Sequence, residues 1–209
     1  YRGICGMPSI SCLCGECELT LSEHRPMMSL FCACKDCSQA MKWCAVHGGR
    51  APPKLPKIIY ARSDIVSVRG KSNMCAFQLR KNSTTTRIHC TKCFSILGVN
   101  HPVYSDNVFA FYPQHCSADV DLSLDPCAAI FMISYDHEDN AEIPNDIPVF
   151  YKFDYPQEWN RFMSVEEVKN SFRKPENPPI GKTFTELIDS LGEIKILDLE
   201  VGAEPSQQA

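Results

Sequence analysis

Thirteen cysteines are the residues of this sequence best suited to chemistry, and most of them lie in short clusters. An odd number cannot pair completely into disulfides within one chain, and cysteines two or three residues apart rarely reach disulfide geometry with each other. Thiolates at that spacing suit one tetrahedral metal ion. Disulfide scaffolds also belong mostly to short secreted chains. The sequence therefore predicts two zinc ions held by cysteine in a reducing compartment, the cytoplasm.

Two short hooks provide the first set of ligands. Cys12 and Cys14 form one hook, and Cys90 and Cys93 form the other, far along the chain. Four thiolates complete a tetrahedral zinc ion and leave no position for a substrate, so we expect a structural site here. Cys17 belongs to the same Cys-x-Cys-x-x-Cys run as the first hook, and an alternative is that it replaces one of the four.

A triplet provides the second set of ligands, because Cys32, Cys34 and Cys37 follow one another within six residues and no second hook completes them. Three thiolates with a vacant position suit a reactive zinc. Their negative charge weakens the metal as a Lewis acid and disfavours hydrolysis. A substrate thiol is the natural fourth ligand, since the metal lowers its pKa. Alternatively, Cys44, His47 or Cys17 closes the triplet into an inert site, and spacing does not decide between the two.

The remaining thiols and histidines lack ligand spacing. Cys5, Cys75, Cys116 and Cys127 are expected to be small buried hydrophobic residues, and the other histidines surface or hydrogen-bonding groups. The net charge of −4 disfavours nucleic acid as a partner. No apolar run approaches the roughly 20 residues of a membrane span, so no membrane partner is expected. The start at Tyr1 suggests that preceding residues are missing, and formation of a homo-oligomer is left open.

The elements that must position the thiols are mostly short β-strands. Residues 1–160 are expected to form one mainly β zinc domain, because runs rich in β-branched and aromatic side chains alternate there with turn residues. One helix-like stretch, residues 36–44, follows the triplet directly. The expected strands cover residues 18–21, 57–60, 65–68, 76–79, 108–112, 129–133 and 149–153.

Residues 161–209 are expected to form a C-terminal extension with one or two short helices and a frayed end. Ser164 and Thr183 each precede a Glu by three positions, which is typical of a capping box at a helix start. The run 173–179 predicts an extended linker between them, and residues 193–201 could add a strand. The extension contains no Cys or His, which favours packing or partner contact over chemistry.

The seven clustered cysteines, in their order and spacing, resemble the family of glutathione-dependent formaldehyde-activating enzymes, which also includes centromere protein V. The resemblance covers about residues 8–115 and fades toward residue 160. It implies a mainly β, Mss4-like β-tent zinc fold, to which this chain adds the short helical C-terminal extension. It also implies a structural zinc on Cys12, Cys14, Cys90 and Cys93 and a catalytic zinc on Cys32, Cys34 and Cys37. The implied activity is a carbon–sulfur lyase reaction that forms S-hydroxymethylglutathione from glutathione and formaldehyde.

The chain departs from the family pattern at Ala33, Ser38 and Phe94, where the family often has His, Arg and Gly. The missing Arg removes one candidate partner for a glutathione carboxylate, and other cations are the candidate replacements: Lys35, Lys42, Arg50, Arg62, Arg80 and Arg87. The candidate pocket walls are Trp43, Tyr60, Phe77 and Phe111. Two hypotheses follow: an enzyme acting on a thiol such as glutathione and a small electrophile, or a non-catalytic zinc module that binds a protein partner.

Overall fold

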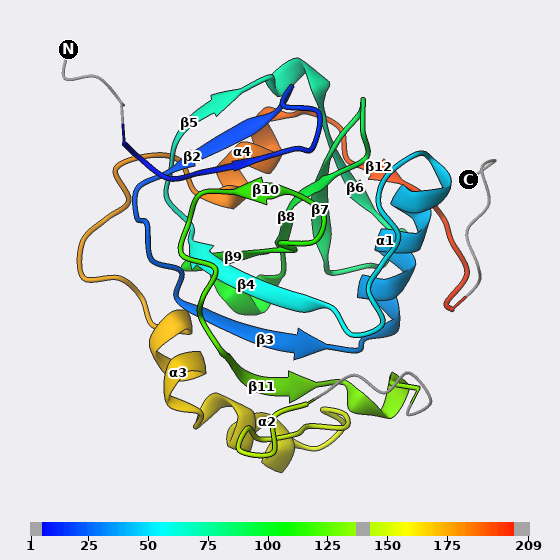
Figure 1. Ribbon diagram of the computed structural model, residues 1–209, viewed down its shortest axis with the longest axis vertical. Helices are drawn as coiled ribbons and strands as arrows, with labels where there is room; N and C mark the ends of the chain where they lie inside the picture. The colour runs from blue at the N-terminus through cyan, green and yellow to red at the C-terminus, as the bar shows by residue number, and fades with distance from the viewer. Residues whose placement is uncertain (1–5, 137–142, 203–209) are drawn as a thin grey trace.

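The computed structural model describes residues 6–136 and 143–202, so Cys5 and His137 lie outside the described residues. Within these ranges twelve strands form two sheets and four α-helices pack around them, which confirms a mainly β chain (Figure 1). The small sheet has the order β10-β1-β2-β5, with β10 (Ser117–Ala118), β1 (Ser9–Ser11), β2 (Glu18–Leu21) and β5 (Ile65–Arg69). The large sheet has the order β11-β3-β4-β9-β8-β7-β6-β12. Its strands are β11 (Pro126–Ile130), β3 (Met28–Cys32), β4 (Lys57–Arg62), β9 (Val108–Phe111), β8 (Ile96–Asn100), β7 (Thr86–Cys90), β6 (Met74–Gln78) and β12 (Lys195–Ile196).

Strand β4 shows how the large sheet builds two hydrophobic cores. Ile58 and Tyr60 belong to the core that also contains Trp43, whereas Ile59 and Ala61 belong to the core shared with the small sheet. Successive side chains of a strand point to opposite faces, so one strand contributes to both cores. The large sheet is therefore covered on both faces.

Helix α1 (Lys35–Val46) confirms the helix expected from residues 36–44. Cys34 is its N-cap, and the Cys34 sulfur accepts a hydrogen bond from the backbone N–H of Cys37 at 3.2 Å. The helix packs on the large sheet through Trp43, whose ring lies 5.2 Å from that of Phe77. This packing holds against the large sheet the helix whose N-cap and first turn carry two of the triplet cysteines.

The chain differs from expectation around residues 129–163. The strand expected at 149–153 does not form, and that expected at 129–133 ends at Ile130 as β11. The reason is a 3-10 turn, η3 (Met132–Ser134), which interrupts the ladder so that only an isolated bridge joins Ala129 to Val149.

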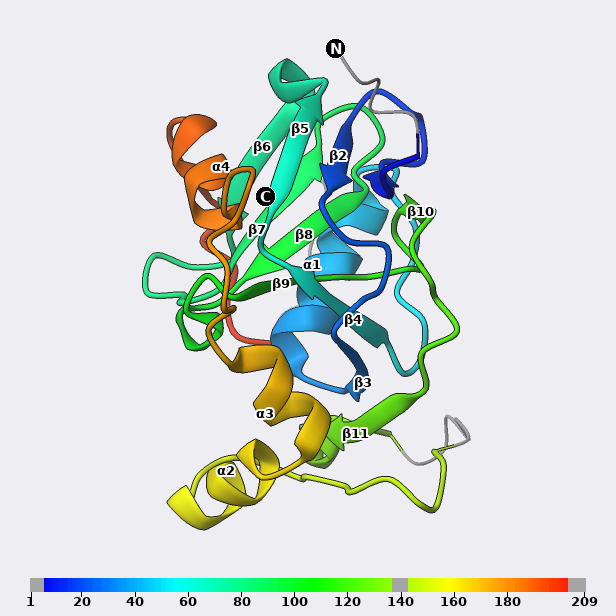
Figure 2. The ribbon, with the colours of Figure 1, turned by 90° about the vertical axis from the view of Figure 1, so that its left-hand side faces the viewer.

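Helices α2 (Pro156–Met163) and α3 (Glu166–Phe172) follow, near the β11 edge of the large sheet (Figure 2). The capping box expected at Ser164 is wrong, because α3 starts after Val165 and Ser164 is instead the C-cap of α2. Helix α2 was not expected, although it starts with Pro156 at a first-turn position that favours proline. The boundary expected after residue 160 lies inside α2.

The capping box expected at Thr183 is confirmed at the start of α4 (Phe184–Ser190). The Phe184 ring stacks on Phe109 at 4.7 Å, and a Cβ at Gly98 would lie 2.4 Å from that ring, so only glycine leaves room for it. The expected strand within 193–201 is confirmed as β12, which pairs in parallel with β6. The extension thus belongs to the same packed structure as the first 160 residues. Among the helices of the described residues, none combines the length and the apolar character of a membrane span.

Candidate functional site

The four-cysteine cluster (Cys12, Cys14, Cys90 and Cys93) unites the thiols of the two hooks, with all four sulfurs within 4.8 Å of one another. The Cys12 and Cys14 sulfurs lie 3.4 Å apart, and those of Cys14 and Cys90 lie 3.8 Å apart. Zinc–sulfur bonds near 2.3 Å would separate the sulfurs of a tetrahedral site by about 3.8 Å. The cluster therefore fits a zinc ion with four protein ligands.

Two turns hold this cluster. One follows β1 and the other joins β7 to β8, and the backbone N–H of Leu13 in the first donates to Ser95 Oγ in the second at 3.1 Å. Burial raises the pKa of Cys93, but hydrogen bonds from Ser95 outweigh it and bring that pKa to about 6. Phe94, which replaces the Gly of the resembled family, adopts a left-handed φ of 53° and stacks on His89 at 5.2 Å. These contacts favour the thiolate of Cys93, whereas burial raises the pKa values of Cys12 and Cys90.

Cys17 is buried beside the four-cysteine cluster without belonging to it. Its thiol donates to the backbone carbonyls of Gly70 and Asn73, at 3.5 Å in both cases. Burial raises its pKa far above the usual value, which favours the protonated thiol. Its place in the structure is that of a hydrogen-bonded core residue.

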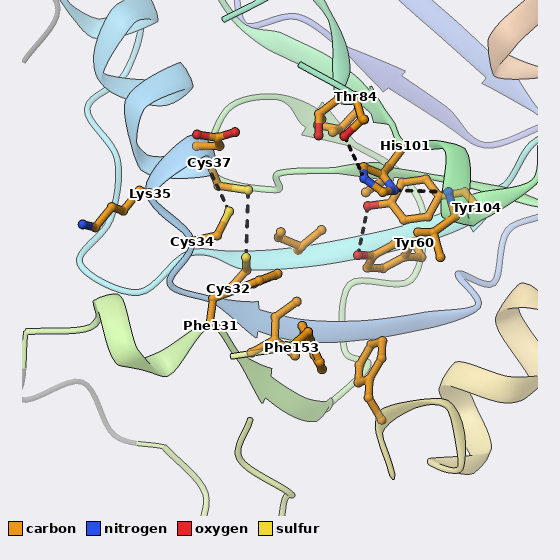
Figure 3. A pocket seen from close by; sticks show the side chains of 18 of the residues that line it. Cys32, Cys34, Lys35, Cys37, Tyr60, Thr84, His101, Tyr104, Phe131 and Phe153 are labelled. Carbon is orange, nitrogen blue, oxygen red and sulfur yellow. Dashed lines mark hydrogen bonds between the residues drawn. The ribbon is translucent and has the colours of Figure 1, made fainter. Parts of the chain in front are cut away.

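The three-cysteine cluster (Cys32, Cys34 and Cys37) brings together the triplet, and Figure 3 shows the three sulfurs converging. Cys32 ends β3, Cys34 caps α1 and Cys37 lies in its first turn. The sulfurs of Cys32 and Cys37 are 3.9 Å apart, a separation that fits shared coordination of zinc. The helix N-terminus also favours negative charge at the cluster.

The candidates for a fourth protein ligand do not join this cluster. Cys44 is buried on the same helix, but the described metal-ligating group contains only the three triplet thiols. The Nδ1 atom of His47 lies 2.8 Å from the backbone oxygen of Trp43, and its ring packs on Trp43. Cys17 is held near the other cluster. Among the described His, Cys, Asp and Glu side chains, the triplet therefore gathers three ligands and no fourth.

A cavity of about 490 Å³ adjoins the three-cysteine cluster. Exposed Lys35 and Thr84 lie where it meets solvent. Such a volume is ample for a small organic molecule. The cavity therefore gives a ligand access to the triplet sulfurs.

Arg87 and Tyr112 are buried polar groups in the cavity wall. Among the described residues, Nε and Nη1 of Arg87 and the Tyr112 hydroxyl have no hydrogen-bond partner. Hydrogen bonds from Cys32 and Cys34, assisted by the Arg87 charge, hold the pKa of Cys37 well below its usual value despite burial. Burial raises the pKa of Tyr112 well above its usual value, so its hydroxyl stays protonated. Both side chains can donate to an anionic oxygen beside the cluster.

A second polar group lies across the cavity. The hydroxyls of Tyr60 and Tyr104 are 3.2 Å apart, and His101 Nε2 is 3.1 Å from Thr84 Oγ1 (Figure 3). These atoms already have partners, unlike those of Arg87 and Tyr112. In this second group, which also contains Tyr104, His101 and Thr84, only Tyr60 was expected from the sequence to line the cavity.

Two of the six candidate cations line the cavity, Lys35 and Arg87. Figure 3 shows the Lys35 side chain pointing away from the triplet. Arg50 and Arg62 donate to the backbone carbonyls of Gln114 and Asn107. Arg80 does not line the cavity itself but pairs with Asp36, which does. Arg87 is therefore the one candidate cation described as buried in the cavity wall.

Of the four aromatic residues expected as walls, only Tyr60 lines the cavity. Trp43, Phe77 and Phe111 are buried in the two cores instead. Most of the lining residues precede residue 126, but the chain after that residue adds an aromatic part of the wall that the sequence did not indicate. Its aromatic members are Phe131, Phe153, Trp159, Phe162 and Phe172.

Comparison with known proteins yields no family model, no curated protein and no solved structure that matches this chain.

Proposed function

We propose that the protein is a zinc-dependent carbon–sulfur lyase that makes or cleaves the adduct of a thiol, such as glutathione, with an aldehyde, of which formaldehyde is the simplest. The observation that carries the proposal is a trio of thiols, without a fourth protein ligand among the described residues, in the wall of a cavity of about 490 Å³. The cysteine spacing that resembles the formaldehyde-activating family supports it. On the basis of that resemblance we also propose that the fold is Mss4-like. We further propose that the protein is cytoplasmic.

The roles of the chain's own residues follow from their placement. Cys32, Cys34 and Cys37 hold the reactive zinc, which when bound would lower the pKa of the substrate thiol and keep it as a thiolate. Arg87 donates hydrogen bonds to the aldehyde oxygen as negative charge develops there. Tyr112 supplies the proton that this oxygen takes up. The proton lost by the thiol balances the one gained, so addition needs no oxidant or reductant.

The four-cysteine cluster has a different role in this proposal. Four sulfurs complete a tetrahedral ion, so its zinc would hold the two turns together without meeting substrate. Zinc bound only by the folded chain contributes its binding free energy to folding. The chain would thus use one metal for stability and the other for chemistry.

A variant of one triplet ligand tests the proposal. We expect the purified protein to hold two zinc ions and to bind glutathione by isothermal titration, and Cys34→Ser to lose one zinc and the binding. Cys75→Ser is the matched control, because Cys75 is a free thiol outside both clusters. Glutathione binding that persists in Cys34→Ser, or that is absent from the protein with two zinc ions, would overturn the proposal.

A second candidate function is a zinc module that binds a protein partner. The observation in its favour is a set of exposed apolar side chains near η3 and α2, with exposed fractions of 62% for Ile133, 56% for Tyr151 and 63% for Tyr155. Ile133 and Tyr151 are adjacent, because the backbone N–H of Ile133 donates to the Tyr151 carbonyl at 3.2 Å. A protein-binding module does not need to bind a thiol, so the isothermal titration with glutathione separates the two functions.

A further inference from the structure

We propose that the cavity selects an aldehyde bearing a bulky apolar group, of the arylalkyl class, in preference to a one-carbon aldehyde. The inference rests on the proposed function and concerns the substrate of that same site. It follows from the size of the cavity, the residues of its wall and the backbone that places one of them.

The size of the cavity exceeds what a one-carbon group needs. A water molecule occupies about 30 Å³ of liquid, and formaldehyde is not much larger. The cavity of about 490 Å³ would leave most of its space unfilled around such a group. A substrate that fits must occupy the space beyond the triplet sulfurs.

The wall of that space is aromatic. We call Phe131, Phe153, Trp159 and Phe162 the aromatic wall. Phe153 is at its centre, with ring centroids 5.1 Å from Phe131, 5.6 Å from Trp159 and 5.2 Å from Phe162. Figure 3 shows Phe131 and Phe153 on the Cys32 side of the triplet. A further aromatic ring packs favourably against the edges and faces that such a wall presents.

Three of these rings are only partly buried, although they pack against the main core. Phe131, Phe153 and Trp159 are of intermediate exposure and line the cavity. Covering apolar surface stabilises a complex by about 25 cal/mol per Å². An apolar substituent would cover this surface, whereas a hydroxymethyl group would leave it exposed to water.

The backbone of Phe131 is a further observation. Its φ of 58° lies in the left-handed region, which a bulky side chain rarely adopts. Phe131 is the N-cap of η3, the turn that interrupts the strand expected at 129–133. Strained conformations persist where the surrounding structure requires them and cluster at ligand sites. Here the turn keeps an aromatic ring in the cavity wall.

The same wall is a poor match for the charged parts of glutathione. A carboxylate or ammonium in an apolar surrounding is costly unless it is paired. Arg87 is the one buried cation described there, and Lys35 points away from the triplet toward solvent. The charged ends of a thiol carrier therefore fit the exposed rim at Lys35 and Thr84, and the apolar group of the aldehyde fits the aromatic wall.

The chemical step is unchanged by this substrate. The thiolate sulfur forms a bond to the carbonyl carbon, the π electron pair of the carbonyl moves to oxygen, and that oxygen takes up a proton. The product is an S-(1-hydroxyalkyl) adduct, and cleavage runs through the same atoms in reverse.

Cobalt-substituted protein provides a test that does not depend on turnover. Thiol ligation changes its visible spectrum, so glutathione is titrated first, and acetaldehyde or phenylacetaldehyde is then titrated at saturating glutathione. These aldehydes differ by one phenyl ring. Burial of that ring predicts about 10- to 100-fold tighter binding of phenylacetaldehyde. A preference of less than about twofold with glutathione bound overturns this inference and leaves the proposed function standing. Absence of any spectral response to glutathione overturns both.

Two variants place the preference in the aromatic wall. Trp159→Ala should reduce the preference for phenylacetaldehyde several-fold. Tyr155→Ala is its control and should leave the preference unchanged, because the Tyr155 side chain is exposed at the start of α2, the helix that carries Trp159. Ser134→Trp fills the cavity from an exposed lining position, which avoids the risk of unfolding a core. It should weaken phenylacetaldehyde binding and spare acetaldehyde. An undiminished preference in Trp159→Ala and Ser134→Trp would show that the ring binds elsewhere and overturn the inference.

Discussion

The two cysteine clusters use the same ligand atom in contrasting settings. The four-cysteine cluster joins two turns from distant parts of the chain, and one of its members, Cys14, is exposed. The three-cysteine cluster comes from one short segment at the start of α1, and it borders a cavity that contains unpaired donors. Ligand number and surroundings, rather than ligand type, thus separate a site suited to holding the fold from one suited to reaction.

The largest expected effect is on stability and tests the structural role of the four-cysteine cluster. Cys90→Ser removes one ligand from the four-cysteine cluster and should cost at least about 5 kcal/mol of unfolding free energy, because metal binding there is coupled to folding. For a chain of 209 residues this corresponds to a fall in Tm of about 10–20 °C. Calorimetry together with zinc quantification measures it, with Cys75→Ser as control. Retention of two zinc ions with an unchanged Tm would contradict the structural role.

Chelation compares the two clusters within one molecule. The three-cysteine cluster has fewer protein ligands and faces a cavity, so a chromogenic chelator should remove its zinc at least about tenfold faster than the other. Cys34→Ser should lack the fast phase and keep the slow one. Equal release rates for the two ions would remove the kinetic distinction between the clusters.

Arg87→Met tests the reactive role proposed for the three-cysteine cluster. Loss of one preorganised donor to a developing oxyanion typically lowers kcat by about 10²- to 10³-fold. We expect a loss of that size in adduct formation, with zinc content unchanged and glutathione affinity within about threefold. Arg69→Met is the control, because Arg69 pairs with Glu18 and neither residue lines the cavity. A loss of zinc equal to the loss of rate would assign Arg87 to holding the cluster instead.

The last prediction concerns His115, which lies between the two clusters. Its ring is 6.2 Å from Tyr112 in the cavity wall, and the next residue, Cys116, belongs to the core that holds Cys12. Burial, assisted by the Arg50 charge, lowers the pKa of His115 to about 4, so the folded chain keeps the ring neutral. The unfolded chain binds the proton near pH 6.5, and this stabilisation is therefore complete above pH 6.5 and is lost as the pH falls toward 4.

His115→Leu removes that titration. Between pH 7 and pH 4 the original chain should lose about 2–3 kcal/mol more unfolding free energy than the variant. Urea titrations at several pH values give the difference. Parallel pH profiles for the two proteins would show that His115 titrates normally.

Much of the candidate site was predictable because metal ligands follow strict spacing. The two clusters contain the seven cysteines expected, and α1 follows the triplet as its pattern indicated. Ligand geometry is local within each hook, so the sequence carries it. Whether Cys44 closed the triplet depended instead on the face of α1 it occupies, which packing decides.

The aromatic wall was not predictable by the same means. Phe153 and Trp159 have the same residue types as core side chains, and their role depends on η3 breaking the strand expected at 129–133. The sequence signals here are weak: Pro156 marks the start of α2, and the pattern at Ser164 predicts a helix start where a helix ends. Arg87 was one of six candidate cations, and only its place on β7 distinguishes it.

The division of the cavity between chain segments has an evolutionary consequence. All seven ligands precede residue 94, whereas the aromatic wall lies entirely after residue 126. Substitutions, insertions or shifts of helix in the later segment can reshape the chamber without moving a sulfur atom. A lineage of such proteins could therefore diversify the compounds it accepts while inheriting one unaltered reaction centre.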